Sequence, residues 1–415
     1  MEIAYSEVLQ GVRNVVTPRR SICPPNRLET RNRDLLAALP KLRDSGTLLD
    51  LADFLRRLTG RAHIVFVPSC RAAIFRILSL LPQKEVVMPV FTCPVVGAAV
   101  KAAGKEIIYV DSARHNINST SVEFSVHAKP NRILLPTHLF GIPTDITNIS
   151  EVARAQGCVT IEDAAAACGA EYNGRPLGTS ADFGVFSFER SKRFPAFRGA
   201  AIVVNNNGIL DPRMLSDEHW KSEHGGALYW DLAFAMAHNI ATIPWIYGRF
   251  VLPKLLRRYA AWGRTGAVCS AEDPCRSPYY VHRFHPFQAA LVLRMLGRLE
   301  QIRAHIRLLV STYVEVLRDA PLITFVPDRY DAAGMLRFPI ALEVDRTRFL
   351  RLALERGIFL ETNYEALLAE SATQGGFPNA TWVSRNMVLL PLYTGLSMRN
   401  ARGLARVVAA IAGQA

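Results

Sequence analysis

A lysine and an aspartate stand out in this 415-residue chain, because both follow apolar segments and both can hold a reactive group. Lys192 comes after Phe186-Ser187-Phe188, and Asp163 ends Val159-Thr160-Ile161-Glu162-Asp163, about one supersecondary unit upstream. An amine can bind an aldehyde as a Schiff base, and a carboxylate can keep a pyridine nitrogen protonated so that the ring draws electrons from a substrate. The pair predicts a pocket for pyridoxal 5'-phosphate with Lys192 as its catalytic residue.

The surroundings of these two residues favour this chemistry over commoner roles. A lysine after an arginine is usually a solvated charge, but the strand before Lys192 is apolar on both faces and should end in the interior. An aspartate before a run of alanines is often a helix N-cap. Here Ala165 would instead lie against a planar ring, and a buried Asp163 opposite a protonated ring nitrogen favours both ionised forms.

A phosphate site is expected where a strand leads into a helix, since free backbone N–H groups and the helix dipole attract an anion there. Ser69, Cys70 and Arg71 occupy such a position, after an apolar run and at the start of an expected helix. Arg71 can add a charge-assisted contact, although an arginine in a first turn is commonly just solvated. Phe91 is the candidate to stack on the other face of the ring, although an isolated aromatic residue is more often part of the core.

Charge and composition indicate which ligands and which cellular location to expect. The chain is half apolar, with a formal charge of +13 and a sequence pI near 9.6. Its arginines are dispersed and no groove-reading element accompanies them, so we expect anionic small molecules as ligands and no nucleic acid. Seven scattered cysteines without metal-ligand spacing indicate a reducing cytoplasm and no metal site. The N-terminus lacks the pattern of an export signal, so secretion is not expected.

Short apolar runs alternate with helical patterns through the first half of the chain. The expected strands cover residues 64–67, 85–88, 107–110, 133–135, 159–161, 183–188 and 200–204, and helical patterns cover 48–58, 71–81, 95–103 and 149–155. This rhythm predicts an α/β fold with a mostly parallel sheet, helices on both faces, and a site at the strand ends. Pro286 to Leu317 is expected to form one long helix before a smaller C-terminal α+β domain.

These patterns divide the chain into four parts. They are an N-terminal arm (1–45), a large cofactor-binding α/β domain (46–225), an apolar and basic helical insertion (226–280), and a long helix with a small α+β domain (281–415).

The composition of the insertion resembles that of a segment that contacts a membrane. Leu232 to Ile246 is almost wholly apolar, and basic residues follow at Arg249, Lys254, Arg257 and Arg258. Polar residues and a proline interrupt the run, so no continuous span of about 18 to 20 apolar residues exists to cross a bilayer. A buried helix or a subunit contact is the favoured interpretation, and an amphipathic helix that lies on a membrane surface through 226–262 is the alternative.

A set of short motifs runs in order from about residue 40 to the C-terminus. They are Phe91-Thr92-Cys93-Pro94-Val95-Val96, Thr137-His138-Leu139-Phe140-Gly141-Ile142-Pro143, Ile161-Glu162-Asp163-Ala164-Ala165, Gly178 with Asp182-Phe183-Gly184, Phe186-Ser187-Phe188 before Lys192, Gln288-Ala289-Ala290-Leu291, and Leu390-Pro391-Leu392-Tyr393. In these motifs the chain resembles the DegT/StrS-like sugar aminotransferase family of fold type I pyridoxal phosphate enzymes. The resemblance implies the covalent cofactor link on Lys192, the pyridine contact on Asp163, a phosphate contact on Ser187, and a homodimer with shared active sites.

Three positions depart from the family's pattern. A Gly-Thr pair after the first serine is Cys70-Arg71 here, a frequent glutamine after the aspartate is Ala166, and an asparagine that a partner subunit often lends falls at Val281. Arg71 is a candidate to replace some of the lost phosphate contacts. On the substrate side we expect His138, Arg283, His285, Asn363 and Tyr364.

The resemblance implies a transaminase that carries an amino group from glutamate to a nucleotide-linked keto sugar, for surface polysaccharide or a secondary metabolite. In such an enzyme, the amine of Lys192 moves a proton between substrate and cofactor. Two alternatives stay open: a lyase, dehydratase or other non-transaminating enzyme with the same cofactor, and a membrane-associated regulatory homologue without catalysis. We expect a cytoplasmic protein, with peripheral contact to the inner membrane face as the alternative location.

Overall fold

A seven-stranded sheet forms the centre of the computed structural model, which describes residues 24–25, 27–216, 220–221, 225–255, 277–326, 334–364, 367–368 and 376–414. The strand order is β1-β9-β8-β5-β4-β2-β3. The strands are β1 (His63–Val67), β2 (Glu85–Pro89), β3 (Glu106–Val110), β4 (Arg132–Leu134), β5 (Val159–Asp163), β8 (Phe183–Ser187) and β9 (Ala200–Val204). Neighbours from β3 to β8 are parallel, whereas β9 is antiparallel to both β8 and β1.

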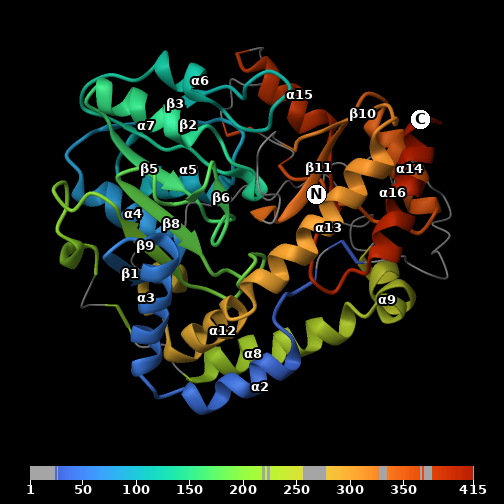
Figure 1. The fold of residues 1–415 in the computed structure, drawn as a ribbon, viewed down its shortest axis with the longest axis horizontal. Coiled ribbons are helices and arrows are strands. Elements are labelled where there is room, and N and C mark those ends of the chain that lie inside the picture. Colours follow the sequence, from blue (N-terminus) through green and yellow to red (C-terminus); the bar gives the residue numbers. More distant parts are fainter. Residues whose placement is uncertain are drawn as a thin grey trace.

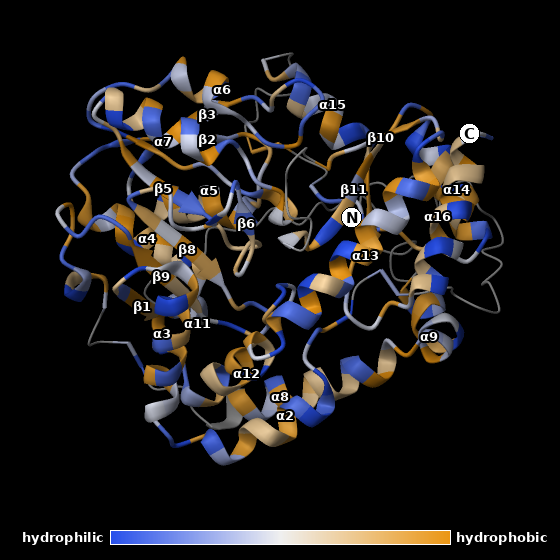
Figure 2. Cartoon of the chain, in the orientation of Figure 1, coloured by the Kyte–Doolittle hydropathy of each residue, from blue (hydrophilic) through white to orange (hydrophobic). Residues whose placement is uncertain are grey.

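Helices cover both faces of this sheet (Figure 1). They are α3 (Gly46–Thr59), α4 (Cys70–Leu80), α5 (Pro94–Ala102), α6 (Ser121–Ser125) and α7 (Ile146–Ala155). Strand alternation decides which helices a side chain meets: Val86 and Met88 pack with α4 and α5, and Val87 packs with α6 and α7. Since both faces are buried, the strands are mostly hydrophobic (Figure 2), and the prediction of a mostly parallel sheet between two helical layers is confirmed.

A second, antiparallel sheet lies beside the first (Figure 1). Its strands are β10 (Leu322–Thr324), β11 (Arg337–Leu342) and β12 (Met387–Pro391), with β11 in the middle. The helices in this part are α13 (Leu299–Leu317), α14 (Arg346–Glu355), α15 (Pro378–Asn386) and α16 (Met398–Ala412). The short strands β6 (Glu171–Tyr172) and β7 (Arg175–Pro176) form a separate hairpin before β8.

The prediction of one long helix from Pro286 to Leu317 is wrong, because the segment contains two helices. The first, α12 (Pro286–Leu296), ends before Gly297, and α13 begins at Leu299. Glycine costs about 1 kcal/mol in a helix interior relative to alanine. Arg298, at φ −114° and ψ 17°, leaves the helical conformation, and its guanidinium forms an ion pair at 2.9 Å with Asp34 of α2 (Asn32–Ala38).

The predicted insertion is helical where the structure describes it. It contains α8 (Gly225–Ala241), α9 (Pro244–Ile246), η4 (Tyr247–Val251) and α11 (Pro278–Val281). None of the described helices is long and apolar enough to span a bilayer. Arg257, Arg258 and the cysteines at 23, 269 and 275 lie outside the described residues. In this single chain α8 is buried on one face only: Ala235 is fully buried, whereas Trp230 is 78 % exposed.

The loop before β8 lies so close to this strand that no side chain fits between them. A Cβ on Gly184 would lie 2.0 Å from the carbonyl oxygen of Gly178. Gly178 has a φ of +88°, and a Cβ there would lie 2.7 Å from the ring of Phe186. Only glycine at both positions lets the loop rest directly on β8.

We expect Gly184→Ala to lower the free energy of unfolding by about 2 kcal/mol or more, because backbone atoms have to move apart. Urea unfolding of the purified protein measures the change. Gly403→Ala is the matched control: its Cβ would meet no atom within 4 Å, and it should stabilise α16 by about 0.5–1 kcal/mol. Equal stability of Gly184→Ala and the wild type would contradict the packing described here.

Candidate active site

A cavity of about 420 Å³ opens where the carboxyl ends of the parallel strands approach the second sheet. In open α/β sheets this edge is the usual place for a ligand. Most of the predicted site residues line the cavity, namely Ser69, Cys70, Arg71, His138, Asp163, Ala165, Ser187, Lys192, Asn363 and Tyr364. Residues far apart in the sequence thus meet in one place.

Lys192 lies partly buried in the loop between β8 and β9. The loop folds back on itself, since the N–H of Ala196 donates to the carbonyl of Phe188 at 2.7 Å. The neighbouring Arg193 is buried and forms an ion pair with Glu29 of the N-terminal arm. These contacts fix the loop on both sides of Lys192, so its amine is held at the cavity.

Asp163 ends β5 and is almost completely buried. Its Oδ1 accepts the N–H of Ala165 at 3.1 Å and lies 4.0 Å from Sγ of Cys70. Burial raises the pKa of this carboxyl, while the Ala165 N–H and the charge of Lys192 act in the opposite direction. Asp163 forms no ion pair with any residue the structure describes, so a cation in the cavity would stabilise its ionised form.

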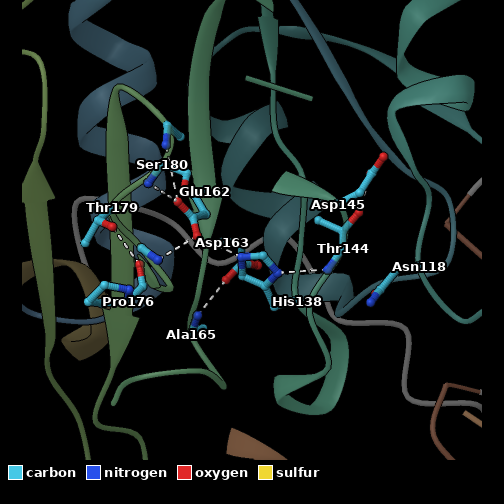
Figure 3. Close-up of polar contacts among 12 residues, drawn as sticks. Asn118, His138, Thr144, Asp145, Glu162, Asp163, Ala165, Pro176, Thr179 and Ser180 are labelled. Carbon is cyan, nitrogen blue, oxygen red and sulfur yellow. Dashed lines mark hydrogen bonds and ion pairs between the residues drawn. The ribbon is translucent and has the colours of Figure 1, made fainter. Parts of the chain in front are cut away.

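His138 is locked in the wall next to Asp163 (Figure 3). The N–H of Thr144 donates to Nδ1 at 3.1 Å, so Nδ1 carries no hydrogen and Nε2 donates to Oε1 of Glu162 at 2.8 Å. The fully buried Glu162 carboxylate also accepts three backbone N–H groups from residues 178–181. Both ring nitrogens of His138 are therefore engaged with the protein, and neither is available to exchange a proton with a substrate.

The predicted phosphate position lies at the N-terminus of α4. Ser69 caps this helix: its Oγ accepts the N–H of Ala72 at 3.2 Å and donates to the carbonyl of Tyr279 at 2.5 Å. The guanidinium of Arg71 lies over the Tyr279 ring, 4.3 Å from its centroid. Since Ser69 and the first turn of α4 line the cavity, the positive end of the helix dipole is available to an anion there.

Two buried hydroxyls in the cavity wall lack a hydrogen-bond partner within the described parts of the chain. They are Oγ1 of Thr92, after β2, and Oγ1 of Thr137, which lies next to Asp163 in the sheet. An unsatisfied buried hydroxyl costs about 1–3 kcal/mol. A ligand with polar groups that reach these hydroxyls would recover this free energy.

Three of the predicted residues lie away from the cavity. Phe91 is fully buried and packs edge-on against Tyr364, with the ring centroids 6.0 Å apart. Arg283 is exposed and donates to the carbonyl of Trp220 at 2.7 Å. His285 caps α12 through its ring nitrogen. The geometry therefore gives no support to ring stacking by Phe91 or to substrate contacts by Arg283 and His285.

Sequence reasoning missed several residues of the cavity and of its support. Thr92, Thr137 and Glu162 stand inside motifs that were recognised, but an unpaired hydroxyl or a buried carboxylate cannot be seen in a motif. Arg337 and Glu361 form a buried ion pair at 2.7 Å in the cavity wall. They are 24 positions apart, and only the pairing of distant segments brings them together.

Comparison with known proteins agrees with this geometry. The model of the DegT/DnrJ/EryC1/StrS aminotransferase family matches residues 41–260 and 266–412. The chain belongs to this aminotransferase family. The family and the enzyme class expected from the motifs are thereby confirmed.

Individual relatives cover the chain to different extents. A UDP-N-acetyl-3-dehydro-alpha-D-glucosamine 3-aminotransferase from Acidithiobacillus ferrooxidans is 30% identical over 219 residues, which are 47% of this chain and 59% of that protein. The uncharacterized protein MJ1066 of Methanocaldococcus jannaschii is 22% identical, over 90% of this chain and 94% of its own. The solved PMP form of the putative sugar aminotransferase Spr1654 from Streptococcus pneumoniae has a TM-score of 0.73 at 18% identity, covering 94% and 99% of the two chains. This likeness shows the shared fold.

Thr92→Val and Thr137→Val should each raise the unfolding free energy of the cofactor-free protein by about 1 kcal/mol, because each removes an unpaired hydroxyl. The same changes should weaken the binding of pyridoxal phosphate by about fivefold to tenfold, since a ligand contact is lost. Urea unfolding and cofactor titration measure the two effects.

Thr59→Val is the matched control, because the Thr59 hydroxyl is buried and donates to the carbonyl of Leu55 at 2.7 Å. It should lower stability and leave cofactor affinity unchanged. If Thr92→Val and Thr137→Val lower the unfolding free energy as much as Thr59→Val does, their hydroxyls are satisfied without a ligand.

Proposed function

We propose that this aminotransferase uses pyridoxal 5'-phosphate and carries an amino group from glutamate to a nucleotide-linked keto sugar, in the synthesis of a surface polysaccharide or a secondary metabolite. One observation carries the proposal: Lys192 and Asp163, the amine and the carboxylate that this cofactor needs, line a single cavity. The PLP and PMP forms of Spr1654, which share the fold, support the cofactor. The name of the 3-aminotransferase relative supports a nucleotide-linked sugar as the acceptor.

The cavity fits this cofactor. Lys192 would hold its aldehyde and Asp163 its ring nitrogen, while Ser69, Arg71 and Ser187 would hold its phosphate together with the first turn of α4. Such a ligand would satisfy the Asp163 carboxylate and the two wall hydroxyls, which have no ion-pair or hydrogen-bond partner, respectively, among the residues that the structure describes. When bound, the cofactor would supply a cationic ring that withdraws electrons from the substrate carbon.

The residues around the ring have separate tasks in the reaction. The buried Asp163 carboxylate would keep a proton on the ring nitrogen, because it forms no ion pair within the part of the chain that the structure describes. Nζ of Lys192 would move a proton between the substrate carbon and the cofactor. His138 holds the wall next to Asp163 in place, and the small Ala165 leaves room for a flat ring.

The departures from the family's pattern leave the cavity with a different phosphate end. Burial raises the pKa of the Cys70 thiol well above its ordinary value, so this side chain stays neutral there. Arg71 follows directly and is the cation nearest in sequence to the helix end. We propose that Arg71 takes over phosphate contacts that the family makes with other residues.

We expect Lys192→Ala to lower turnover with glutamate by about 1000-fold or more, because it removes the amine that moves the proton. Asp163→Asn should lower it by about 100-fold, since an amide brings no charge to the ring nitrogen. Ultraviolet–visible spectra after addition of glutamate measure the conversion of the bound cofactor to its amine form. Lys101→Ala, on the exposed side of α5, should react like the wild type. A wild type that binds cofactor but shows no conversion would favour a lyase instead.

We also propose that the chain acts in the cytoplasm as a homodimer, as the family resemblance implies, with a peripheral contact to the membrane. Cys70, Cys93, Cys158 and Cys168 are free thiols, which suits a reducing compartment.

The outer face of α8, α9 and η4 supports the membrane contact. From Leu228 to Leu255 the exposed residues are all apolar or basic: Tyr229, Trp230, Ala233, Phe234, Ala237, Ile240, Trp245, Arg249, Phe250 and Lys254. A two-fold contact with a second copy would bring like charges of this face together, whereas anionic headgroups would neutralise them. Exposed tryptophans beside basic residues are typical of helices that lie in a membrane interface.

The protein should therefore float with vesicles that contain phosphatidylglycerol and stay behind with vesicles of phosphatidylcholine alone. Trp230→Ser combined with Trp245→Ser should weaken vesicle binding by about tenfold or more. Val122→Ser removes an equally exposed apolar side chain from α6 and should have no effect. If vesicles are not bound and the tryptophan changes instead reduce the molecular mass in solution, the face belongs to a contact between two copies.

A further inference from the structure

One ion pair in the cavity wall has no task in the reaction described so far. Arg337 begins β11, and Glu361 lies beside Leu389 of β12, so the backbone of the second sheet fixes both residues. Both line the same cavity as Lys192. The pair therefore borders the space that a substrate has to occupy.

The pair is buried but not saturated with hydrogen bonds. Nε of Arg337 donates to Oε2 of Glu361 at 2.7 Å, and Nη1 donates to the carbonyl of Leu336 at 2.9 Å. The two side chains are 10% and 8% exposed. Nη2 and Oε1 make no hydrogen bond to the parts of the chain that the structure describes. Since a buried ion pair is favourable only when its remaining donors and acceptors are satisfied, these two atoms leave room for a ligand.

The free atoms suit a hydroxyl group, which can donate to Oε1 of Glu361 and accept from Nη2 of Arg337 at the same time. A ligand carboxylate suits them less, because it can only accept and brings a second negative charge next to Glu361. Tyr364 lines the same cavity, and burial raises the pKa of its phenol well above the ordinary value, so it adds a neutral hydroxyl. The part of the wall formed by Arg337, Glu361 and Tyr364 is therefore polar but has no net charge.

We propose that Arg337 and Glu361 form a subsite for the uncharged, hydroxylated ring of the acceptor sugar, and that Glu361 selects against sugars with a carboxylate at this place. The inference rests on the proposed function, which puts the acceptor in this cavity. In the absence of the Glu361 charge, Arg337 becomes a site for an anion.

Calorimetric titration of the holoenzyme with UDP-glucose and UDP-glucuronic acid tests this selection without catalysis. The two ligands differ by one carboxylate, and neither carries a keto or an amino group. The wild type should bind UDP-glucose about tenfold more tightly than UDP-glucuronic acid. Glu361→Gln should abolish or reverse this preference. As a matched control, Glu315→Gln breaks an exposed ion pair with Arg402 and should leave the preference as it is.

The same preference in the wild type and Glu361→Gln would overturn the inference, as would a wild type that prefers UDP-glucuronic acid. Because Glu361→Gln leaves Arg337 buried without a counter-charge, Arg337→Gln/Glu361→Gln is measured alongside it; removal of both charges should bring the affinity ratio close to one. If neither ligand binds, the subsite inference fails, whereas conversion of the cofactor by glutamate reports the proposed transamination independently.

Discussion

The buried carboxylate of Asp163 is the constraint on which the rest of the site depends. A charge without a counter-ion is unfavourable in a protein interior, and burial accordingly raises the pKa of this group. The other groups of a binding site lie around it at the strand ends: the partly buried amine of Lys192, the N-terminus of α4, and two hydroxyls that have no hydrogen-bond partner among the described residues. The free energy of these buried groups is thus least favourable when the cavity is empty, as expected for a site that binds a polar, partly cationic ring.

Glu162 and Asp163 are neighbours in β5 but have different roles: Glu162 supports the cavity wall, and Asp163 faces the cavity. Alternation along the strand directs successive side chains to opposite faces, so Glu162 meets the loop 178–181 while Asp163 meets the cavity. The close approach of Gly178 and Gly184 lets this loop deliver its N–H groups to Glu162, which then holds His138. A fully hydrogen-bonded network of this kind is rigid, and it keeps the wall beside Asp163 in one arrangement.

The sequence predicted what depends on local patterns. Short apolar runs located the strands, and the change from strand to helix at Ser69 located the helix end that could take a phosphate. Local patterns failed where tertiary contacts decide. The helical spacing of apolar residues continues through Gly297, but the helix ends there. Next to this break, Arg298 forms an ion pair with Asp34. The ion pair of Arg337 with Glu361 could not be foreseen, because it joins two segments that carry no motif.

The central claim is that one amine in this chain holds the cofactor opposite the Asp163 carboxylate. Incubation of the full-length protein with pyridoxal phosphate, reduction with borohydride and mass mapping of the peptides tests it directly, since reduction makes the lysine–cofactor bond permanent. The account predicts a single modified lysine, Lys192. Modification of a different lysine, or spread over several surface lysines without preference, would contradict it.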